Sequence, residues 1–410
     1  MPDASPLGSA RRIAVVTVGR SDFSILRPLC HALDEAPDFA PMLWAGGAHF
    51  DATAGLTIRD IEGSGLPIGA RIEASDFGHD PAAVAGNMAQ QTAGFAQAAA
   101  AAIAAGQRPD LVLVLGDRYE AVAAGLAMVP FGLPVGHISG GSITEGAMDD
   151  MFRHALTKLA ALHFCDLPEF ARRIRQMGEE PWRIHVTGAL GLDGILARPI
   201  RPLHDLAAEF SLPGLKPGYV LATLHPETVA QHRTPEIAAA MVAALERSGR
   251  QVVYTYPNAD PGADSIIAAI EAAARRLDHH HVVRNFGSQW FYSAMAHAGV
   301  VVGNSSSGIY EAASFGLPVV DIGDRQRGRF HGDNVLHVAG DAAAIRATLD
   351  RALALAPDLA GMTNPYGDGR ASQRLIAALR GLDWDRLAAP KLFLPDDPGY
   401  QAERIALPCN

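Results

Sequence analysis

The fold is decided by the stretch Gly299-Val300-Val301-Val302-Gly303-Asn304-Ser305-Ser306-Ser307-Gly308-Ile309-Tyr310-Glu311. Its apolar start predicts a buried strand, and the residues from Gly308 onward are compatible with a helix. The Gly-Asn-Ser-Ser-Ser turn between them leaves backbone N–H groups free at a helix N-terminus, which is an anion site suited to phosphate. Glu311 lies one turn further on, where a carboxylate can accept hydrogen bonds from two ribose hydroxyls. The alternative is a serine that only caps a helix in an α/β protein.

The same alternation of strands and helices extends to both sides of this stretch. Expected strands in the first half are Arg12–Val18, Met42–Ala45, Leu111–Leu115, Val135–Ser139, Leu162–Cys165 and Ile184–Thr187. The helices expected between them are Ile25–Glu35, Pro81–Ala105, Glu120–Val129, Met151–Leu159 and Glu169–Met177. This alternation is typical of a parallel sheet with helices on both faces.

A proline-rich segment, Ala197–Pro217, interrupts the pattern and predicts an interdomain linker. The strands expected after it are Tyr219–Leu224, Gln251–Tyr256, His281–Arg284, Gly299–Val302 and Pro318–Ile322. The expected helices are Pro235–Arg247, Ala263–Arg276, Gln289–His297, Gly308–Ser314, Asp341–Ala354 and Ala371–Leu382. We therefore predict two Rossmann-like, doubly wound α/β domains, residues 1–197 and 198–370, followed by a C-terminal helix and tail, 371–410. The tail is expected to pack on the first domain or on a partner subunit. Ligands of such sheets bind beyond the carboxyl ends of the strands, so the active site is expected in the interdomain cleft.

Composition limits the classes of function. The 410 residues are 49% hydrophobic and 19% charged with a net charge of -10, which is typical of a globular protein and argues against a nucleic-acid surface. Three cysteines without paired spacing argue against disulfides and structural zinc, and fit a cytoplasmic protein. No signal peptide or membrane-spanning run is expected. The run Asp278-His279-His280-His281 is interpreted as a surface loop, and no metal site is predicted.

Polar residues follow the predicted strands of the first domain. In Gly19-Arg20-Ser21-Asp22, Arg20 offers a charge-assisted fork to a phosphate, although Asp22 is equally consistent with an ordinary helix N-cap. In Gly116-Asp117-Arg118-Tyr119-Glu120, Asp117 is either a base or half of an ion pair. The glycine-rich loop after Val135–Ser139 adds Glu145, Asp149 and Asp150 at a helix start. Asp149 and Asp150 are consistent with complementing the helix dipole, whereas Glu145 has no evident structural role.

Three strand ends of the second domain carry further polar groups. His225 follows the first strand and is expected to exchange protons near neutral pH, or else to fix the turn. Asn258 follows the second strand, in Tyr256-Pro257-Asn258-Ala259-Asp260. Arg325 lies in the loop Gly323–Arg329, whose three arginines form a basic patch in an acidic protein and favour phosphate binding.

Taken together, these motifs resemble the hydrolysing UDP-N-acetylglucosamine 2-epimerases of sialic-acid and nonulosonic-acid biosynthesis. The resemblance covers most of the chain, from Gly19-Arg20-Ser21-Asp22 to Asn334-Val335. Its most specific blocks are Gly116–Glu120, Gly140–Lys158, Thr223–Pro226, Tyr256–Asp260 and Gly303–Glu311. It implies a fold like that of glycosyltransferase B. It also implies elimination of UDP with loss of the C2 proton to a 2-acetamidoglucal, followed by hydration to free N-acetylmannosamine, without a cofactor.

The resemblance also assigns roles to residues. It implies that Asp117 and Asp149 are catalytic carboxylates and that His225 lies beside the leaving phosphate. Donors at the diphosphate are then Arg20, Arg325 and the serine segment, in which Ser305 and Ser306 match nucleotide-binding positions, as does Glu311. Family members usually carry a glutamate in the His-x-x-Gly-Gly-x segment, where this chain has Ser139 and Ser142. Glu145 is the candidate to replace it.

Several alternatives remain at this point. A UDP- or GDP-linked 2,4-diacetamido-trideoxyhexose would keep the chemistry and change the sugar. A glycosyltransferase would need an acceptor, and a non-catalytic nucleotide-sugar sensor would need no acid or base. A non-hydrolysing epimerase is disfavoured by Leu224-His225-Pro226-Glu227-Thr228, and a redox epimerase by the absence of a Gly-x-Gly-x-x-Gly motif after the first strand. The expected partners are a nucleotide sugar and a second copy of the chain, as a homodimer, and neither nucleic acid nor membrane.

Overall fold

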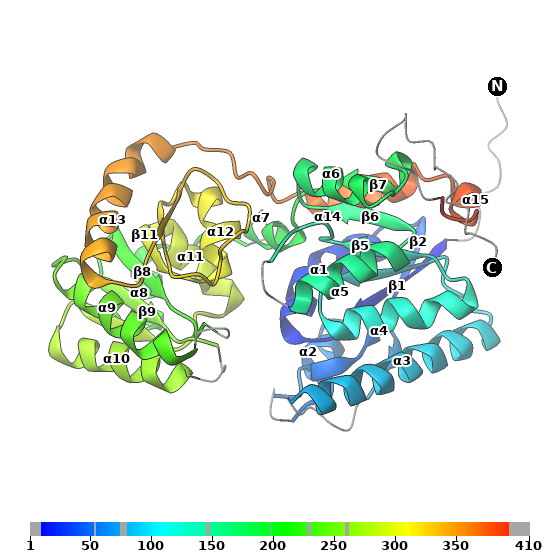
Figure 1. Cartoon of the computed structure of the whole chain (residues 1–410), viewed down its shortest axis with the longest axis horizontal. Coiled ribbons are helices and arrows are strands. Elements are labelled where there is room, and N and C mark those ends of the chain that lie inside the picture. Colours follow the sequence, from blue (N-terminus) through cyan, green and yellow to red (C-terminus); the bar gives the residue numbers. More distant parts are fainter. Residues whose placement is uncertain are drawn as a thin grey trace, which may run out of the picture. The chain divides into compact units, whose positions relative to one another are not determined.

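The computed structural model describes residues 10–52, 55–73, 80–144, 148–196, 198–227, 231–258 and 262–392. Figure 1 traces the helices and strands of the chain. Among the described residues, a first compact unit takes those up to Ser142, between Gly146 and Leu190, and from Arg370 onward. A second unit takes the remainder, which is residues 143 and 144 and Gly191–Gly369. Glu145, a predicted acid–base residue, lies outside the described residues.

The first unit is built on a seven-stranded sheet in the order β3-β2-β1-β4-β5-β6-β7. Its strands are β1 (Arg11–Thr17), β2 (Phe39–Ala45), β3 (Ile68–Arg71), β4 (Leu111–Leu115), β5 (Val135–Ile138), β6 (Leu162–Cys165) and β7 (Ile184–Val186). Its helices are α1 (Arg20–Asp34), α2 (Ile58–Glu62), α3 (Pro81–Ala104), α4 (Tyr119–Met128), α5 (Met148–Leu159), α6 (Pro168–Gln176), α14 (Ala371–Arg380) and α15 (Trp384–Leu387). All the pairs between neighbouring strands are parallel.

Helices cover both faces of this sheet, and β1 shows why its sequence is continuously apolar. Ile13 and Val15 belong to one buried cluster, together with side chains of α1 and α14. Ala14 and Val16 belong to a second cluster, together with side chains of α3 and α4. Successive side chains of a strand point to opposite faces, so a strand with two covered faces needs apolar residues at every position.

The second unit repeats this design with six strands in the order β10-β9-β8-β11-β12-β13. They are β8 (Tyr219–Thr223), β9 (Val252–Thr255), β10 (His280–Val283), β11 (Ala298–Gly303), β12 (Val319–Ile322) and β13 (Val335–Val338). Its helices are α7 (Asp193–Leu196), α8 (Leu203–Glu209), α9 (Thr234–Glu246), α10 (Ala263–Arg276), α11 (Gly287–His297), α12 (Ser306–Tyr310) and α13 (Ala342–Leu355). The order of strands reverses between β8 and β11 here and between β1 and β4 in the first unit. Such a reversal marks the place where open parallel sheets bind ligands.

The predicted fold class, two doubly wound α/β domains, is confirmed, but several elements differ from their predictions. The short edge strands β3 and β13 were not predicted, because four-residue strands at a sheet edge lack a long apolar run. Helix α8 lies inside the segment predicted as a linker, with Pro202 at its N-cap. Helix α1 begins at Arg20 rather than at Ile25. No helix among the described residues is long and apolar enough to cross a membrane.

Candidate active site

The carboxyl edge of the first sheet gathers charged groups around Arg153. This side chain comes from α5, is only 2% exposed and pairs with Asp117, which follows β4 and keeps 31% of its side chain exposed. The same guanidinium lies 2.9 Å from Asp150 Oδ1 and donates to the Ser142 carbonyl at 3.1 Å. A buried cation therefore fixes the orientation of an accessible carboxylate at the end of a strand, which is an arrangement suited to a base.

Arg118 belongs to a second cluster of charged side chains. Its guanidinium makes a two-pronged contact with Glu120, at 3.2 and 2.9 Å. Glu120 is 1% exposed, whereas nearly half of the Arg118 side chain faces solvent. Burial raises the pKa of Asp22, at the start of α1, to about 6, against the lowering effect of Arg118. Arg20, the first residue of α1, is exposed.

The strand ends next to Asp117 carry a buried histidine and a buried carboxyl. His137 Nε2 lies 2.8 Å from the Gly116 carbonyl, and burial lowers its pKa to about 3, so the ring is neutral and donates to that carbonyl. Ser139, directly after β5, donates from Oγ to Asp166 Oδ1 at 2.8 Å. Asp166 is 5% exposed, and burial raises its pKa to about 6. Asp166 was not among the predicted site residues, although it directly follows the predicted strand Leu162–Cys165.

Asp149 and Asp150, at the start of α5, differ in their surroundings. Asp149 lies exposed in the first turn of α5. Its neighbour Asp150 contacts both Arg153 and His154 Nε2, the latter at 3.5 Å. The structure therefore places Asp150 against the buried guanidinium of Arg153 at this helix start.

In the second unit, Asn304 joins the ends of β8 and β11. Its side chain accepts from the His225 backbone N–H at 2.7 Å and donates to the His225 carbonyl at 2.9 Å. Gly303, just before it, has φ +134, and a Cβ there would lie 1.8 Å from the Thr223 carbonyl oxygen. The close approach of these two strand ends therefore requires glycine at position 303.

The Asn304 side chain thereby holds the backbone of His225, which is 8% exposed. His225 Nδ1 accepts from the Asn258 backbone N–H at 3.0 Å, so the hydrogen of the neutral ring is on Nε2. Burial, with a smaller effect of Arg325, lowers its pKa to about 4. We expected a group that exchanges protons near neutral pH. The structure instead gives a neutral hydrogen-bond donor, and the Asn258 contribution comes from its backbone.

The serine segment is present but its helix is short. Ser305 is the N-cap of α12, and its hydroxyl accepts from the Ser307 N–H at 3.4 Å. The five residues of α12, which begin at Ser306, give only a small dipole, so side chains must supply most of the attraction for an anion. Glu311 ends this helix. Burial raises the pKa of Glu311 to about 7, and its Oε2 has no hydrogen-bond partner among the described residues.

The basic loop after β12 contributes one arginine to this site. Arg325 donates from Nη1 to the Asn304 carbonyl at 3.2 Å, and Gln326 donates to the same oxygen at 2.8 Å. Arg327 is exposed and lies 3.8 Å from Asp324. The structure therefore places Arg325 close to both His225 and the serine segment, whereas Arg327 belongs to the surface.

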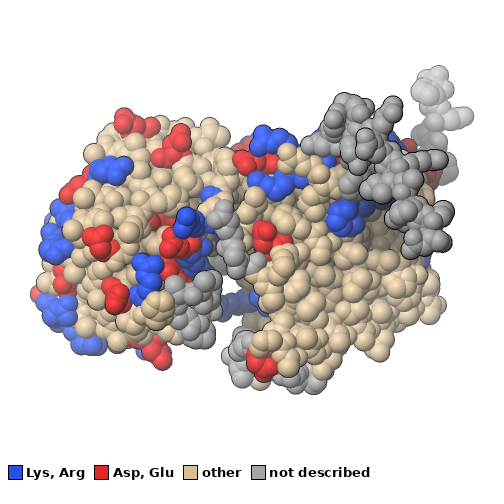
Figure 2. Space-filling view, in the orientation of Figure 1, with Lys and Arg blue, Asp and Glu red and all other residues tan. Residues whose placement is uncertain are grey.

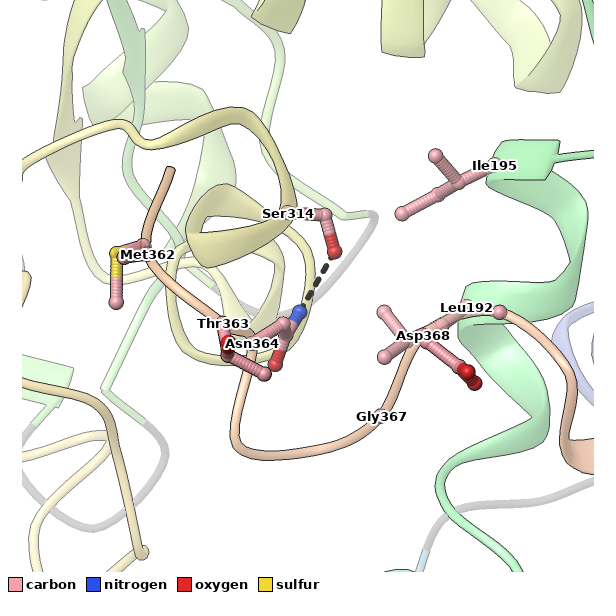
Figure 3. Close-up of a pocket in the computed structure, with 9 residues that line it drawn as sticks. Leu192, Ile195, Ser314, Met362, Thr363, Asn364, Gly367 and Asp368 are labelled. Carbon is pink, nitrogen blue, oxygen red and sulfur yellow. Dashed lines mark hydrogen bonds between the residues drawn. The ribbon is translucent and has the colours of Figure 1, made fainter. Parts of the chain in front are cut away.

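A separate pocket in the second unit contains none of the predicted site residues. Figure 3 shows Leu192 and Ile195 facing the segment Met362–Asn364. Asn364 Nδ2 donates to Ser314 Oγ at 2.7 Å and to the Tyr310 carbonyl at 2.7 Å. Because Tyr310 precedes Glu311, this wall of the pocket also holds the end of α12 in place.

Comparisons with known proteins agree on one family. Residues 31–380 match the sequence profile described as UDP-N-acetylglucosamine 2-epimerase. The UDP-N-acetylglucosamine 2-epimerase of Neisseria meningitidis serogroup B is 30% identical, over 94% of this chain and 99% of that protein. The UDP-N,N'-diacetylbacillosamine 2-epimerase (hydrolyzing) of Legionella pneumophila is 31% identical, over 90% of this chain and 96% of that protein.

Solved structures support the same fold. The crystal structure of a UDP-GlcNAc 2-epimerase from Neisseria meningitidis, bound to UDP-GlcNAc, matches with a TM-score of 0.75. It is 17% identical in the structural alignment, which covers 90% of this chain and 100% of that one. A putative UDP-N-acetylglucosamine 2-epimerase from Listeria monocytogenes matches with a TM-score of 0.72 and 18% identity, over 91% of this chain and 96% of that one.

Proposed function

The chain belongs to the UDP-N-acetylglucosamine 2-epimerase family, and we propose that it is a hydrolysing member. The proposed reaction converts UDP-N-acetylglucosamine to UDP and free N-acetylmannosamine. The C1–O bond to the diphosphate breaks as the C2 proton is lost, which gives a 2-acetamidoglucal. Water then adds at C1 and a proton at C2. This product would enter a route to a sialic or related nonulosonic acid in the cytoplasm.

The observation that carries the proposal is the pair Asp117–Arg153. The reaction needs carboxyl groups of fixed orientation near C2 that take a proton and later return one, and Asp117 is an accessible carboxylate held by a buried guanidinium. Because the C2 hydrogen is weakly acidic, departure of the nucleotide must lead the reaction, so the leaving charge needs strong stabilisation. In the second unit, Arg325 and the neutral His225, with its donor on Nε2, supply it.

We therefore propose that the two units have different roles in the reaction. We assign the nucleotide to the second unit, with Ser305–Ser307 and Arg325 at the diphosphate and Glu311 at the ribose. We assign the acid–base chemistry to the first unit, with Asp117 and Asp149 as the carboxylates. Glu145 remains a candidate acid–base residue from the sequence alone.

A second substrate has specific support. Hydrolysing relatives that act on diacetylbacillosamine nucleotides are as similar to this chain as the N-acetylglucosamine relative, at 30% and 31% identity against 30%. A UDP- or GDP-linked 2,4-diacetamido-trideoxyhexose is therefore the alternative substrate. A glycosyltransferase or a non-catalytic sensor is disfavoured by the family assignment.

The deciding experiment is proton NMR in D₂O of the purified protein with each of these three nucleotide sugars, without acceptor, NAD or added metal. The proposal expects free nucleoside diphosphate and a reducing sugar that is epimerised and deuterated at C2. Asp117→Asn is the control that should abolish the signal. Turnover that requires an acceptor sugar, or an epimer that stays attached to the nucleotide, would contradict hydrolysis.

The proposed active form is a homodimer that uses α3 and α4. Helix α3 spans Pro81–Ala104 without a single charged residue, and it packs beside α4. Leu126 and Val129 at the end of α4 are 50% and 54% exposed, and Figure 2 shows a broad face of the first unit without Lys, Arg, Asp or Glu. Sedimentation of Val129→Glu should shift a dimer toward monomer. A wild-type protein that sediments as a monomer would refute the proposal.

A further inference from the structure

Ser139 combines an unfavourable backbone with a buried partner. Its φ is +61, a left-handed conformation that favours glycine and costs other residues conformational energy. The next two positions are glycines, so a glycine at position 139 would fit the local sequence. Strained residues of this kind persist where the side chain has a role, and the hydroxyl is the group that Ser139 has and a glycine would lack.

The sheet register explains which group the hydroxyl reaches. Strands β5 and β6 are parallel neighbours with Ile138 opposite Phe164, and the Ser139 N–H donates to the Phe164 carbonyl at 2.8 Å. Ser139 and Asp166 therefore lie at adjacent strand ends on the carboxyl edge. The hydrogen bond from Ser139 Oγ to Asp166 Oδ1 is 2.8 Å long. Ser139 is half-buried, whereas Asp166 is 5% exposed, so the serine is the more accessible member of the pair.

The electrostatic surroundings let Asp166 hold or release a proton near neutral pH. Burial raises its pKa to about 6, while the Ser139 hydrogen bond and the charge of Arg153 oppose that rise. Arg153 also holds Asp117, so both carboxyls lie in the field of one buried cation. The neighbouring titratable group, Cys165, is a buried thiol whose pKa burial raises, so it stays neutral.

We propose that Ser139 and Asp166 form a proton relay for the sugar-eliminating step, an inference that rests on the proposed function. In this step the C2–H bond breaks, and its electron pair forms the C1–C2 double bond as the C1–O bond to the diphosphate breaks. The C2 proton passes to Ser139 Oγ while the hydroxyl proton of Ser139 passes to Asp166 Oδ1. A water molecule then gives its proton to Asp117 and its hydroxide to C1, and Asp117 passes the proton to C2 on the opposite face of the sugar, with inversion. Asp166 returns its proton to solvent through Ser139, which restores the relay. The relay supplies the acid–base capacity that Ser142 lacks.

Asp166 acts through Ser139, so the test needs a variant that removes the relay without harming the fold. Ser139→Gly does so, because glycine relieves the positive φ while deleting the hydroxyl. It should unfold at the same or a higher temperature and lose roughly 100-fold in kcat, the usual scale for acid–base catalysis, with little change in KM. The matched control is Ser211→Gly, an exposed serine of the second unit that also has a positive φ, of 53, and whose change should leave kcat intact.

The variant Asp166→Asn is the second test of the relay. It should lose a similar factor in kcat, and the double variant should lose no more than either single one, because both belong to one relay. The acidic limb of the wild-type pH profile, near pH 6, should disappear in Asp166→Asn. A Ser139→Gly enzyme within threefold of wild-type kcat would overturn the relay, as would additive losses in the double variant.

An infrared titration separates this inference from the proposed function. The free protein should show a carboxyl that titrates near pH 6, is absent in Asp166→Asn and shifts to higher pH in Ser139→Gly, because the hydroxyl stabilises the ionised form. If the wild type converts none of the nucleotide sugars, the proposed function fails. This titration then decides alone whether Asp166 holds a proton in contact with Ser139, and an unchanged titration in Ser139→Gly overturns the inference.

Discussion

Replacing Glu311 by glutamine should make the protein more stable and a poorer binder of UDP. Glu311 ends α12, and its Oε2 is buried without a hydrogen-bond partner among the described residues. Its pKa rises from 4.5 to about 7, mainly because burial disfavours the charge. An ionised carboxylate at this position therefore opposes folding, and a neutral amide of the same shape removes that cost.

The size of the effect follows from the shift in pKa. Between pH 4.5 and about 7 the carboxyl ionises in the unfolded chain but keeps its proton in the folded one. The unfolding free energy therefore falls as pH rises through this window and is flat above it. At about 1.4 kcal/mol per pKa unit, the total is at most about 3–4 kcal/mol. Glu311→Gln should thus match the wild type near pH 4 and exceed it by up to that amount at pH 8.

Binding should change in the opposite direction. Ribose hydroxyls that donate to Glu311 favour its charged form, so UDP affinity should rise as pH passes through 7, with release of a proton below that pH. Hydrogen bonds to a charged group contribute about 1.5–3 kcal/mol, so Glu311→Gln should bind UDP roughly 10- to 100-fold more weakly at pH 8. Calorimetry in buffers of different ionisation enthalpy measures both the affinity and the released proton.

The stability and the binding parts of this prediction can each be contradicted by one result. Equal unfolding free energies of Glu311→Gln and wild type at pH 8, measured with urea, would show that the buried carboxylate costs nothing. Unchanged UDP affinity would show that Glu311 does not contact the ribose. Glu236→Gln, an exposed glutamate of α9, is the matched control and should change neither quantity.

Two further predictions concern the first unit. Asp117→Asn and Asp149→Asn should each lower kcat by about two to four orders of magnitude and leave UDP affinity almost intact; kinetics near the wild-type value, or a large loss of UDP affinity by calorimetry, would return them to a structural role. Glu179 is buried between His163, Lys158 and Lys391, and these partners hold its pKa at about 2 despite burial. Its contribution to stability is therefore present above pH 4.5 and lost as pH falls toward 2. Urea unfolding of Glu179→Gln at pH 7 should show a loss of about 3–5 kcal/mol, and a loss below 1 kcal/mol would mean that the cluster stabilises little.

The fold was predictable because its main signal is local. Central strands such as β4 are short apolar runs that end in glycine and charge, and they alternate with helix-length segments. Edge strands lack that signal, since β3 buries no residue fully and β13 only one. Helix α8 was hidden because prolines surround it, although Pro202 at its N-cap is compatible with a helix start.

The sequence predicts which residues belong to the site when they directly follow a strand. It does not predict the chemistry of a residue when that chemistry depends on a tertiary contact. Position alone identified Asp117 and His225, but nothing in the sequence shows that the Asn258 N–H occupies His225 Nδ1 and thereby makes the ring a neutral donor. Arg153 was visible only as a charge on a helix. That it is buried and pairs with Asp117 depends on how α5 packs on the sheet, which is a tertiary contact. Asp166 also directly follows a predicted strand, so its position in the sequence could have identified it in the same way.

Four carboxyl groups with shifted pKa values fall into two groups that differ in their partners. Glu179 is surrounded by two lysines and a histidine, and its pKa is lowered to about 2. Asp22 and Asp166 are raised to about 6 and Glu311 to about 7, each with burial as the largest cause. A carboxyl that serves the fold is best fully paired, whereas one that must change its proton or meet a ligand has to keep part of its pairing capacity free. Asp22 and Asp166 lie where a strand passes into a helix, on the edge where parallel sheets bind ligands, and Glu311 ends the short helix α12 that follows β11. The cost to stability of these three groups therefore falls at places that the proposed reaction uses.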